Sequence, residues 1–275
     1  MTNVSDYLTG YATAEFINYY DRVIADGGQI GSPAECAKTF RLLESKGLIS
    51  SLVGGVGAGF GYKLDGGYVT KLYDLVNADL DQTPSAQALQ STITTTDGVP
   101  YLTLDGSAHT NKPYFRSVTG SDLGTDISFF AAATLDDAAN DENHIAAIEE
   151  SAGSRRVVVS SLSNSGDPRT GGSLRREAGT TQHMYMKNFA PATSSTVQSV
   201  GMLVDGATGV AMYINGECEK YSTTDAGDYL DGRTAYMTTG NVQYGLLGKF
   251  RWSVCFSGGD KFKIRSLIQA LSNGS

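Results

Sequence analysis

The sequence is poor in the residues that most often bind metals or form disulfides. It contains three cysteines, Cys36, Cys218 and Cys255. They are far apart and form no C-x-x-C pair, which excludes a zinc knuckle or a disulfide framework. We expect free buried thiols, with one intermolecular disulfide as the alternative. The three histidines have no second histidine or cysteine at ligand spacing, so we predict no hydrolytic metal site and no cofactor.

An excess of basic residues is also missing. The 275 residues include 21 Lys and Arg against 29 Asp and Glu, which gives a formal net charge of −8. Proteins that bind nucleic acids or anionic lipids carry a basic surface, so we predict neither partner. No apolar run approaches the roughly 20 residues of a membrane helix, which argues against membrane insertion. Residues 1–6 lack the basic and apolar regions of a signal peptide.

The common catalytic motifs are absent as well. The chain has no G-x-S-x-G elbow and no Walker-type phosphate loop. A retaining glycosidase needs two carboxylates about 5 Å apart, and the nearest candidates are Glu217 and Glu219 on one face of a predicted strand. They follow a hairpin turn directly, so we interpret them as a solvated strand tip. We therefore predict that the protein is not an enzyme.

The N-terminal residues 1–49 carry the pattern of two short helices. Thr13 is a candidate N-cap for the first, and Gly27 and Gly28 end it. Ser32, Pro33 and Glu35 form the start signal of the second. Such a helical hairpin is too small to bury its own core, so we expect it to pack on the next domain or on another chain. The aromatic residues predicted to bind a partner in this anchor are Phe16, Tyr20 and Phe40.

A glycine-rich stretch, residues 50–67, follows the helices. Gly55, Gly57, Gly59 and Gly61 alternate along it, which is not the spacing of a dinucleotide-binding loop. We expect a connector, either flexible or closely packed.

From residue 68 to 275, short runs of β-forming residues alternate with turn residues. Glycine is abundant, at 33 residues, and only 18% of residues are charged, which favours strands and turns. The expected strands are 99–104, 127–133, 157–159, 184–189, 197–204, 210–214 and 249–256. Their spacing is typical of an antiparallel sandwich. Asp260 is placed to cap a C-terminal helix whose apolar face carries Ile264, Leu267, Ile268 and Leu271.

Particular segments resemble laminin-G or concanavalin-A-like jelly-roll domains. In one segment, a strand ends in Asp205-Gly206 and an apolar strand follows, and Asn215-Gly216 then forms the hairpin turn to the next strand. Another is the closing strand 248–256, which is followed by the helix. Segments 69–74 and 99–106 are similar to opening strands of such domains in phage proteins, although the family's Trp-Tyr-Asp-Gln is Leu-Tyr-Asp-Leu in 72–75. The resemblance implies a mainly β protein: a concanavalin-A-like jelly-roll sandwich with an N-terminal helical hairpin and a short C-terminal helix.

Charged residues in the middle of the chain suggest contacts. We interpret the acidic stretch 136–150 as a solvated loop, with a structural calcium site as the alternative. The arginines predicted to bind a partner are Arg155, Arg156, Arg175 and Arg176. Arginine pairs well with carboxylates, so we expect these residues to meet the acidic stretch of a neighbouring copy. Scattered loop charges are the alternative.

Tyrosine is common, at 15 residues, against a single tryptophan, Trp252. Nine tyrosines are candidates to line a sugar site or a subunit interface, and most belong at the edge of the core. They are Tyr62, Tyr68, Tyr101, Tyr114, Tyr213, Tyr221, Tyr229, Tyr236 and Tyr244. Trp252 alternates with Phe250 and Val254, which predicts core packing.

Phage structural proteins often begin with a segment similar to residues 16–28. The resemblance therefore implies a non-enzymatic bacteriophage virion protein, a capsid decoration that docks through its N-terminal region onto other virion proteins. We expect a homo-oligomer, a trimer, because such proteins occupy symmetric positions. The first alternative is a tail-fibre adhesin that binds host glycans, and the second is a polysaccharide depolymerase.

Overall fold

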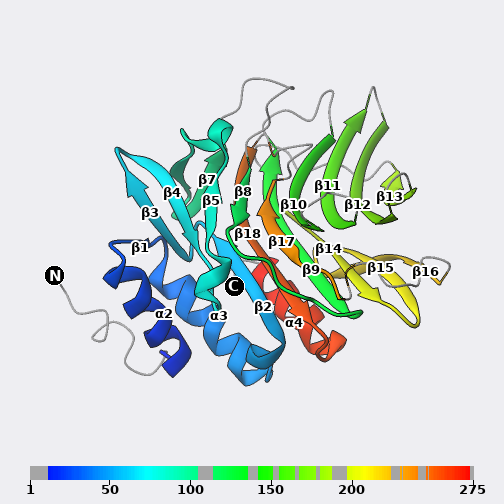
Figure 1. Cartoon of the computed structure of the whole chain (residues 1–275), viewed down its shortest axis with the longest axis horizontal. Helices are drawn as coiled ribbons and strands as arrows, with labels where there is room; N and C mark the ends of the chain where they lie inside the picture. The colour runs from blue at the N-terminus through cyan, green and yellow to red at the C-terminus, as the bar shows by residue number, and fades with distance from the viewer. Residues whose placement is uncertain are drawn as a thin grey trace.

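The computed structural model describes residues 12–104, 114–135, 142–150, 155–164, 167–177, 180–187, 197–223, 230, 232–240, 246 and 248–272. It has three layers: two antiparallel sheets face each other, and the helices cover the outer side of one of them (Figure 1). The predicted fold class, a mainly β sandwich with helices at both ends of the chain, is confirmed.

The first sheet, here sheet A, lies on the side away from the helices. Its strand order is β1 (Gln29–Ile30), β3 (Gly61–Asp65), β4 (Tyr68–Tyr73), β5 (Gln82–Pro84), β8 (Phe115–Ser117), β17 (Ala235–Thr239), β10 (Glu142–Glu150), β11 (Arg156–Asn164), β12 (Asp167–Glu177) and β13 (Thr180–Lys187).

The second sheet, here sheet B, is the middle layer. Its strand order is β16 (Glu217–Ser222), β15 (Gly209–Ile214), β14 (Gln198–Asp205), β9 (Ile127–Leu135), β18 (Gly248–Ser257), β7 (Val99–Leu104) and β6 (Thr92–Thr96). The strand β2 (Leu52–Gly57) pairs with the second half of β18.

The helices are α2 (Ala14–Ala25), α3 (Pro33–Ser45) and α4 (Lys261–Ser272), with short 3-10 turns η1 (Ile49–Ser51), η2 (Ala78–Leu80) and η3 (Ala86–Ala88). Each α-helix begins where the sequence predicts. The Thr13 hydroxyl accepts a hydrogen bond from the Phe16 N–H at 3.2 Å, and the Ser32 hydroxyl accepts one from Glu35 at 3.3 Å. The carboxylate of Asp260 accepts bonds from the first turn of α4. None of the described helices is long and apolar enough to cross a membrane.

Two hydrophobic cores share sheet B. One lies between the sheets, and the other lies between sheet B and the helices. The strand β18 contributes to both because it lies in the middle layer, and a bulge between Phe250 and Trp252 changes which side the residues after it face. Phe250 belongs to the inter-sheet core, whereas Trp252 and Val254 face the helices. The prediction that Trp252 packs in a core is confirmed, but the strict alternation with Phe250 is wrong.

The predicted connector 50–67 is instead part of the sheets. Residues 52–57 form β2 and residues 61–65 form β3. A Cβ atom on Gly57 would lie 2.8 Å from the Arg251 carbonyl oxygen, so a larger residue does not fit there. The glycines are closely packed. Of the two alternatives expected for this stretch, a flexible or a closely packed connector, the packed one is therefore nearer to the structure. The N-terminal helices precede these strands in the chain and share a hydrophobic core with β18. The helical hairpin therefore packs on the sandwich of the same chain.

Candidate functional site

A pocket of about 300 Å³ opens between the outer face of β14–β16 and the start of α4. We call it the β16–α4 pocket. Its lining residues are Leu203, Asp205, Thr208, Gly209, Ala211, Tyr213, Cys218, Tyr221, Lys261, Phe262 and Arg265. The volume matches the lower end of small-molecule sites, which combine apolar walls with a few polar groups.

The turn between β14 and β15 forms one wall and is held rigidly. The Asp205 carboxylate accepts hydrogen bonds from the backbone N–H groups of Ala207 and Thr208, both at 3.0 Å. The same carboxylate forms an ion pair with Lys261 at the start of α4. These partners hold the pKa of Asp205 well below its usual range. The turn and the helix are thus joined by a charge pair that stays ionised at neutral pH.

Aromatic side chains stand at the rim of this pocket. Tyr221 is 56% exposed and Phe262 is 84% exposed. The Tyr221 hydroxyl donates a hydrogen bond to the Thr208 carbonyl at 2.7 Å, which fixes its ring against the turn. Tyr213 is half-buried, its ring lies 6.0 Å from that of Phe130, and burial raises the pKa of its hydroxyl. Exposed rings beside fixed polar groups form a surface with both apolar and hydrogen-bonding character.

Glu217, one of the two carboxylates considered as an acid/base pair, lies at the start of β16 and does not line the pocket. Glu217 forms an ion pair with Arg265 and accepts a hydrogen bond from the Gln269 amide at 2.8 Å. Glu219 lies in a bulge between Cys218 and Lys220, which breaks the strict alternation expected for Glu217 and Glu219. The geometry therefore binds Glu217 to α4 as a structural group outside the lining of the pocket.

The sequence did not predict Asp205, Lys261 or Phe262 as site residues, although Asp205 marked a strand end. The sequence carries one indication for Phe262: it lies outside the apolar face of the predicted C-terminal helix, which carries Ile264 and Leu267. Single exposed apolar residues are common on protein surfaces, so this signal alone would not have marked a site. Tyr213 and Tyr221 were among the tyrosines considered for a sugar site, and the structure brings these two together.

The predicted partner-binding aromatic residues of the anchor are internal. Phe16 and Phe40 are 1% and 0% exposed, and their ring centroids are 6.0 Å apart. Tyr20 is half-buried, with its ring centroid 6.1 Å from that of Phe16. The prediction is wrong for Phe16 and Phe40, because the helices turn their aromatic face onto sheet B. The exposed apolar residues of α2 are Ile17 and Ile24.

The predicted arginine cluster is partly assembled on sheet A. Arg156 and Arg175 are direct neighbours across β11 and β12, and Glu149 is the neighbour of Arg156 on β10. These residues alternate with core residues, so they lie on the face of sheet A away from the core. An acidic neighbour is thus supplied by the same chain. Contact with another copy stays a prediction, as do roles for Arg155 and for Arg176, whose side chain is outside the described residues.

The acidic stretch 136–150 is described only from residue 142 onward. That part forms the strand β10, so the interpretation as a solvated loop is wrong there. Glu149 is buried, and Glu150 pairs with Arg233 at 3.7 Å. The described residues contain no group of three His, Cys, Asp or Glu side chains that could hold a metal ion. The calcium alternative concerned mainly the residues outside this description and stays a prediction.

The cysteines are all free thiols. Cys36 and Cys255 are buried, as predicted, and burial raises the pKa of both. Cys218 is exposed at the β16–α4 pocket, contrary to the prediction that all three are buried. It is the cysteine to which the alternative of an intermolecular disulfide applies.

Solved structures with a similar fold include domain 4 of a GH43 extracellular arabinanase from Geobacillus stearothermophilus, solved with arabinotriose. The TM-score is 0.55 at 13% identity over 81% of this chain and 98% of that one. The binding domain of botulinum neurotoxin serotype D has a TM-score of 0.54 at 12% identity over 82% of this chain. A botulinum neurotoxin type C structure, from a toxin whose cell entry depends on two ganglioside molecules, has a TM-score of 0.54 at 11% identity.

This chain spans about half the length of those toxin chains, with 52% coverage of each. At these identities the likeness defines the fold, a jelly-roll-like β-sandwich. The part of the resemblance that concerned the architecture is therefore confirmed. No family model and no curated protein matches the sequence.

Proposed function

We propose that this chain is a non-enzymatic carbohydrate-binding domain of the adhesin type and that it holds a sugar unit in the β16–α4 pocket. The observation that carries the proposal is the pair of exposed rings, Tyr221 and Phe262, at the rim of a pocket whose polar groups are already fixed. Aromatic residues are enriched where proteins contact partners, because they offer a large contact area with few rotatable bonds. Rigid polar groups lower the entropic cost of binding.

The charges of the pocket favour a neutral sugar. Lys261 is paired with Asp205, and Arg265 is paired with Glu217. Each ion pair is formed within the protein, so the pocket presents dipoles and apolar rings with little net charge. A sugar ring offers apolar C–H faces and hydroxyl groups around its edge, which suits such a surface.

The structural neighbours support a binding role for the fold. The arabinanase domain was solved with arabinotriose, and the type C neurotoxin interacts with gangliosides. A shared fold does not place the site, because jelly-roll sandwiches use different surfaces for different ligands. The location in the β16–α4 pocket rests on the residues of this chain.

A glycan array tests the proposal directly. The purified chain is expected to bind a restricted set of glycans, and the double variant Tyr221→Ala/Phe262→Ala is expected to lose at least ten-fold in apparent affinity. Tyr68→Ala is the matched control, because Tyr68 is 43% exposed but lies on β4, away from the pocket. Absence of any binding, or equal binding by the double variant, would refute the assignment.

The absence of catalysis is part of the same proposal. Incubation with the glycans that bind is expected to release no reducing ends. If reducing ends appear and their release is lost in Glu217→Gln or Glu219→Gln, the protein is a depolymerase and the proposal is wrong. Glu217→Gln also removes one ion pair with Arg265, so its folding is checked by thermal unfolding first.

We further propose a virion setting for the domain, with other virion proteins as its partners. The surface available for docking on the N-terminal helices is the exposed side of α2, where Ile17 and Ile24 are 49% and 45% exposed. Co-purification with intact phage particles tests this, and the copy number separates a shell decoration from a tail component. Sedimentation of the purified chain tests the expected trimer.

A further inference from the structure

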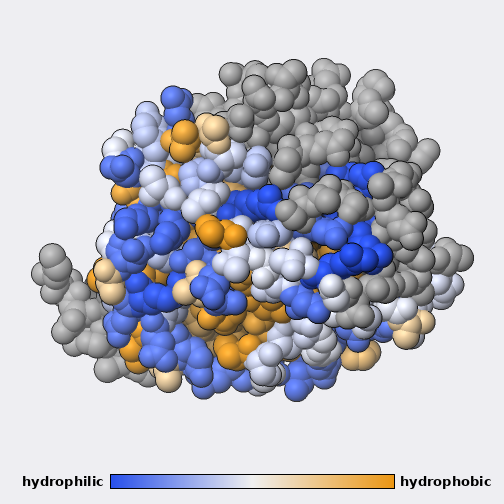
Figure 2. Space-filling model, viewed as in Figure 1, coloured by the Kyte–Doolittle hydropathy of each residue, from blue (hydrophilic) through white to orange (hydrophobic). Residues whose placement is uncertain are grey.

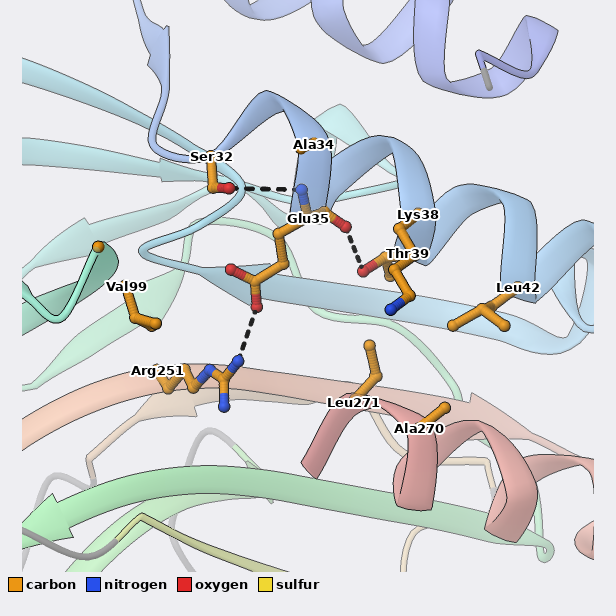
Figure 3. A pocket seen from close by; sticks show the side chains of 11 residues that line it. Ser32, Ala34, Glu35, Lys38, Thr39, Leu42, Val99, Arg251, Ala270 and Leu271 are labelled. Carbon is orange, nitrogen blue, oxygen red and sulfur yellow. Dashed lines mark hydrogen bonds and ion pairs between the residues drawn. The ribbon is translucent and has the colours of Figure 1, made fainter. Parts of the chain in front are cut away.

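A second pocket, of about 270 Å³, lies between α3 and α4 on the outer side of β18 (Figure 3). We call it the α3–α4 pocket. Its lining residues are Ser32, Ala34, Glu35, Lys38, Thr39, Leu42, Gly98, Val99, Arg251, Ala270 and Leu271. It shares none of these residues with the β16–α4 pocket.

The floor of this pocket holds a buried arginine with few acceptors. The Arg251 side chain is 10% exposed, and its Nη2 donates to the Glu35 carboxylate at 3.3 Å. Its Nε is buried and has no acceptor within the residues that the structure describes. A guanidinium offers five N–H donors, and buried donors are normally satisfied. Arg251 therefore has donor capacity that Glu35 alone does not use.

A second cation adds to the first. Lys38 is exposed on α3, one turn beyond Glu35, and its ammonium group points into the gap between the two helices (Figure 3). Among the described residues no carboxylate lies within ion-pair distance of Lys38. Two cations thus face one carboxylate, in a chain whose net charge is −8. Local positive charge in an acidic protein favours an anionic ligand.

The remaining walls are apolar and include Leu42, Val99 and Leu271. They would cover the body of a small ligand while its charged group meets Arg251 and Lys38. Arginine binds carboxylates through two parallel hydrogen bonds, whereas lysine acts as a point charge. The volume is close to what one sugar ring or a small organic acid requires.

We propose that the α3–α4 pocket binds the carboxylate of a small acidic ligand, with an acidic sugar unit as the best fit in size. Arg251 and Lys38 hold the carboxylate, and the apolar walls hold the ring. This site is independent of the proposed sugar site in the β16–α4 pocket. It stands even if that pocket binds nothing.

The test uses sodium glucuronate as the probe and glucose as its neutral counterpart. Titrations of the whole chain are followed by the amide chemical shifts of the residues that line the α3–α4 pocket. At these residues we expect saturable binding of glucuronate and none of glucose at equal concentration, whereas a neutral sugar held in the β16–α4 pocket would shift other amides. Lys38→Ala is expected to weaken glucuronate binding roughly ten-fold or more, the usual effect of losing a bond to a charged group.

Lys46→Ala is the matched control. It removes the same charge just beyond α3, but Lys46 bonds only the Ser266 hydroxyl and does not line the pocket. Arg251→Lys keeps the positive charge beside Glu35 but removes the bidentate guanidinium donor. It is therefore expected to weaken glucuronate binding while the fold is retained. If Arg251→Lys does not fold, Lys38→Ala still decides the question.

The proposal is overturned if glucuronate and glucose shift the amides of the α3–α4 pocket equally, or if Lys38→Ala binds glucuronate as well as the unmodified chain does. The double variant Tyr221→Ala/Phe262→Ala is expected to retain glucuronate binding, which separates this site from the proposed function. A glucuronate-containing oligosaccharide that binds more tightly than free glucuronate would assign the site to polysaccharide. Equal affinity would assign it to a free acid.

Discussion

Arg22 of α2 and Asp81, just before β5, form an ion pair in which Nη1 lies 3.0 and 3.2 Å from the two carboxylate oxygens. The guanidinium also bonds the Asp74 carbonyl and lies over the rings of Tyr19 and Tyr73, at 5.4 and 5.8 Å. The side chains are 27% and 13% exposed. This contact ties the first helix to the edge of sheet A, in addition to the core that it shares with sheet B.

Arg22→Ala is expected to lower the free energy of unfolding by about 1–3 kcal/mol, because the half-buried Asp81 loses its nearest cation and retains Lys71, at 4.0 Å, and the Asp74 backbone N–H. Urea unfolding measures the loss. Arg233→Ala serves as the control, since Arg233 pairs with Glu150 at 3.7 Å and is 47% exposed. It is expected to change stability by less than about 0.5 kcal/mol. Equal effects of the two variants would show that Arg22 contributes nothing beyond a surface pair.

Phe16→Ala is expected to cost about 3–5 kcal/mol, because the ring is 1% exposed and fills the core between α2, α3 and sheet B. Ile17→Ala removes the neighbouring side chain, which is 49% exposed, and is expected to cost less than about 1 kcal/mol. Thermal or urea unfolding compares the two. If both variants unfold like the unmodified chain, the helices are not part of the sandwich core.

Gly57→Ala tests whether residues 50–67 are packed strands. The added Cβ would meet the Arg251 carbonyl at 2.8 Å and the Phe60 ring at 3.0 Å, so backbone must move. We expect a loss of about 1–3 kcal/mol. A flexible connector would respond in the opposite way, because alanine reduces the entropy of the unfolded chain and stabilises by about 0.4–1 kcal/mol. The sign of the change in urea unfolding therefore decides.

Asp74 is expected to make stability depend on pH near neutrality. Burial raises the pKa of its carboxyl to about 7, although the backbone N–H groups of Asn77, Val76 and Gly55 act against this. The folded chain then holds a proton that the unfolded chain, with an ordinary pKa of 3.8, has lost. This contribution to stability is present below about pH 4 and is lost as the pH rises through 7.

Between pH 5 and 7, unfolding free energies are therefore expected to fall by roughly 1 kcal/mol per pH unit. Asp74→Asn has no such titration, so its slope over this range is expected to be shallower. The variant is less stable at pH 5, because one amide oxygen replaces two acceptor oxygens. The low pKa values of Asp26 and Asp205 change stability only at more acidic pH. Identical slopes for the two proteins would contradict the assignment.

Local features of the chain could be predicted well from sequence. The caps at Thr13 and Ser32, the Asn215-Gly216 turn and the apolar face of α4 all depend on interactions within a few residues. Asn215 and Gly216 do adopt positive φ angles of 51° and 80°. Such signals need no knowledge of distant partners, which is why they were reliable.

The sides that residues face were harder to predict. The alternation in residues 50–67 is compatible with a loop or a strand, and only the pairing of β2 with β18 decides. Trp252 and Phe250 face different cores because a bulge interrupts β18. Phe16 and Phe40 were recognised as important, but the sequence could not show whether they face a partner or the same chain. Each of these outcomes depends on contacts between segments far apart in sequence.

The sequence by itself determined that this protein is a mainly β sandwich with capped helices at its ends, because hydrophobic periodicity and turn residues act locally. Only the tertiary structure decided which side chains line the two pockets. Asp205, Tyr221 and Phe262 meet because β15 brings β14 and β16 into one sheet and α4 packs on its outer face. Lys38 and Arg251 line the other pocket although more than 200 positions separate them. Such juxtapositions arise from long-range packing, to which no local pattern in the chain corresponds.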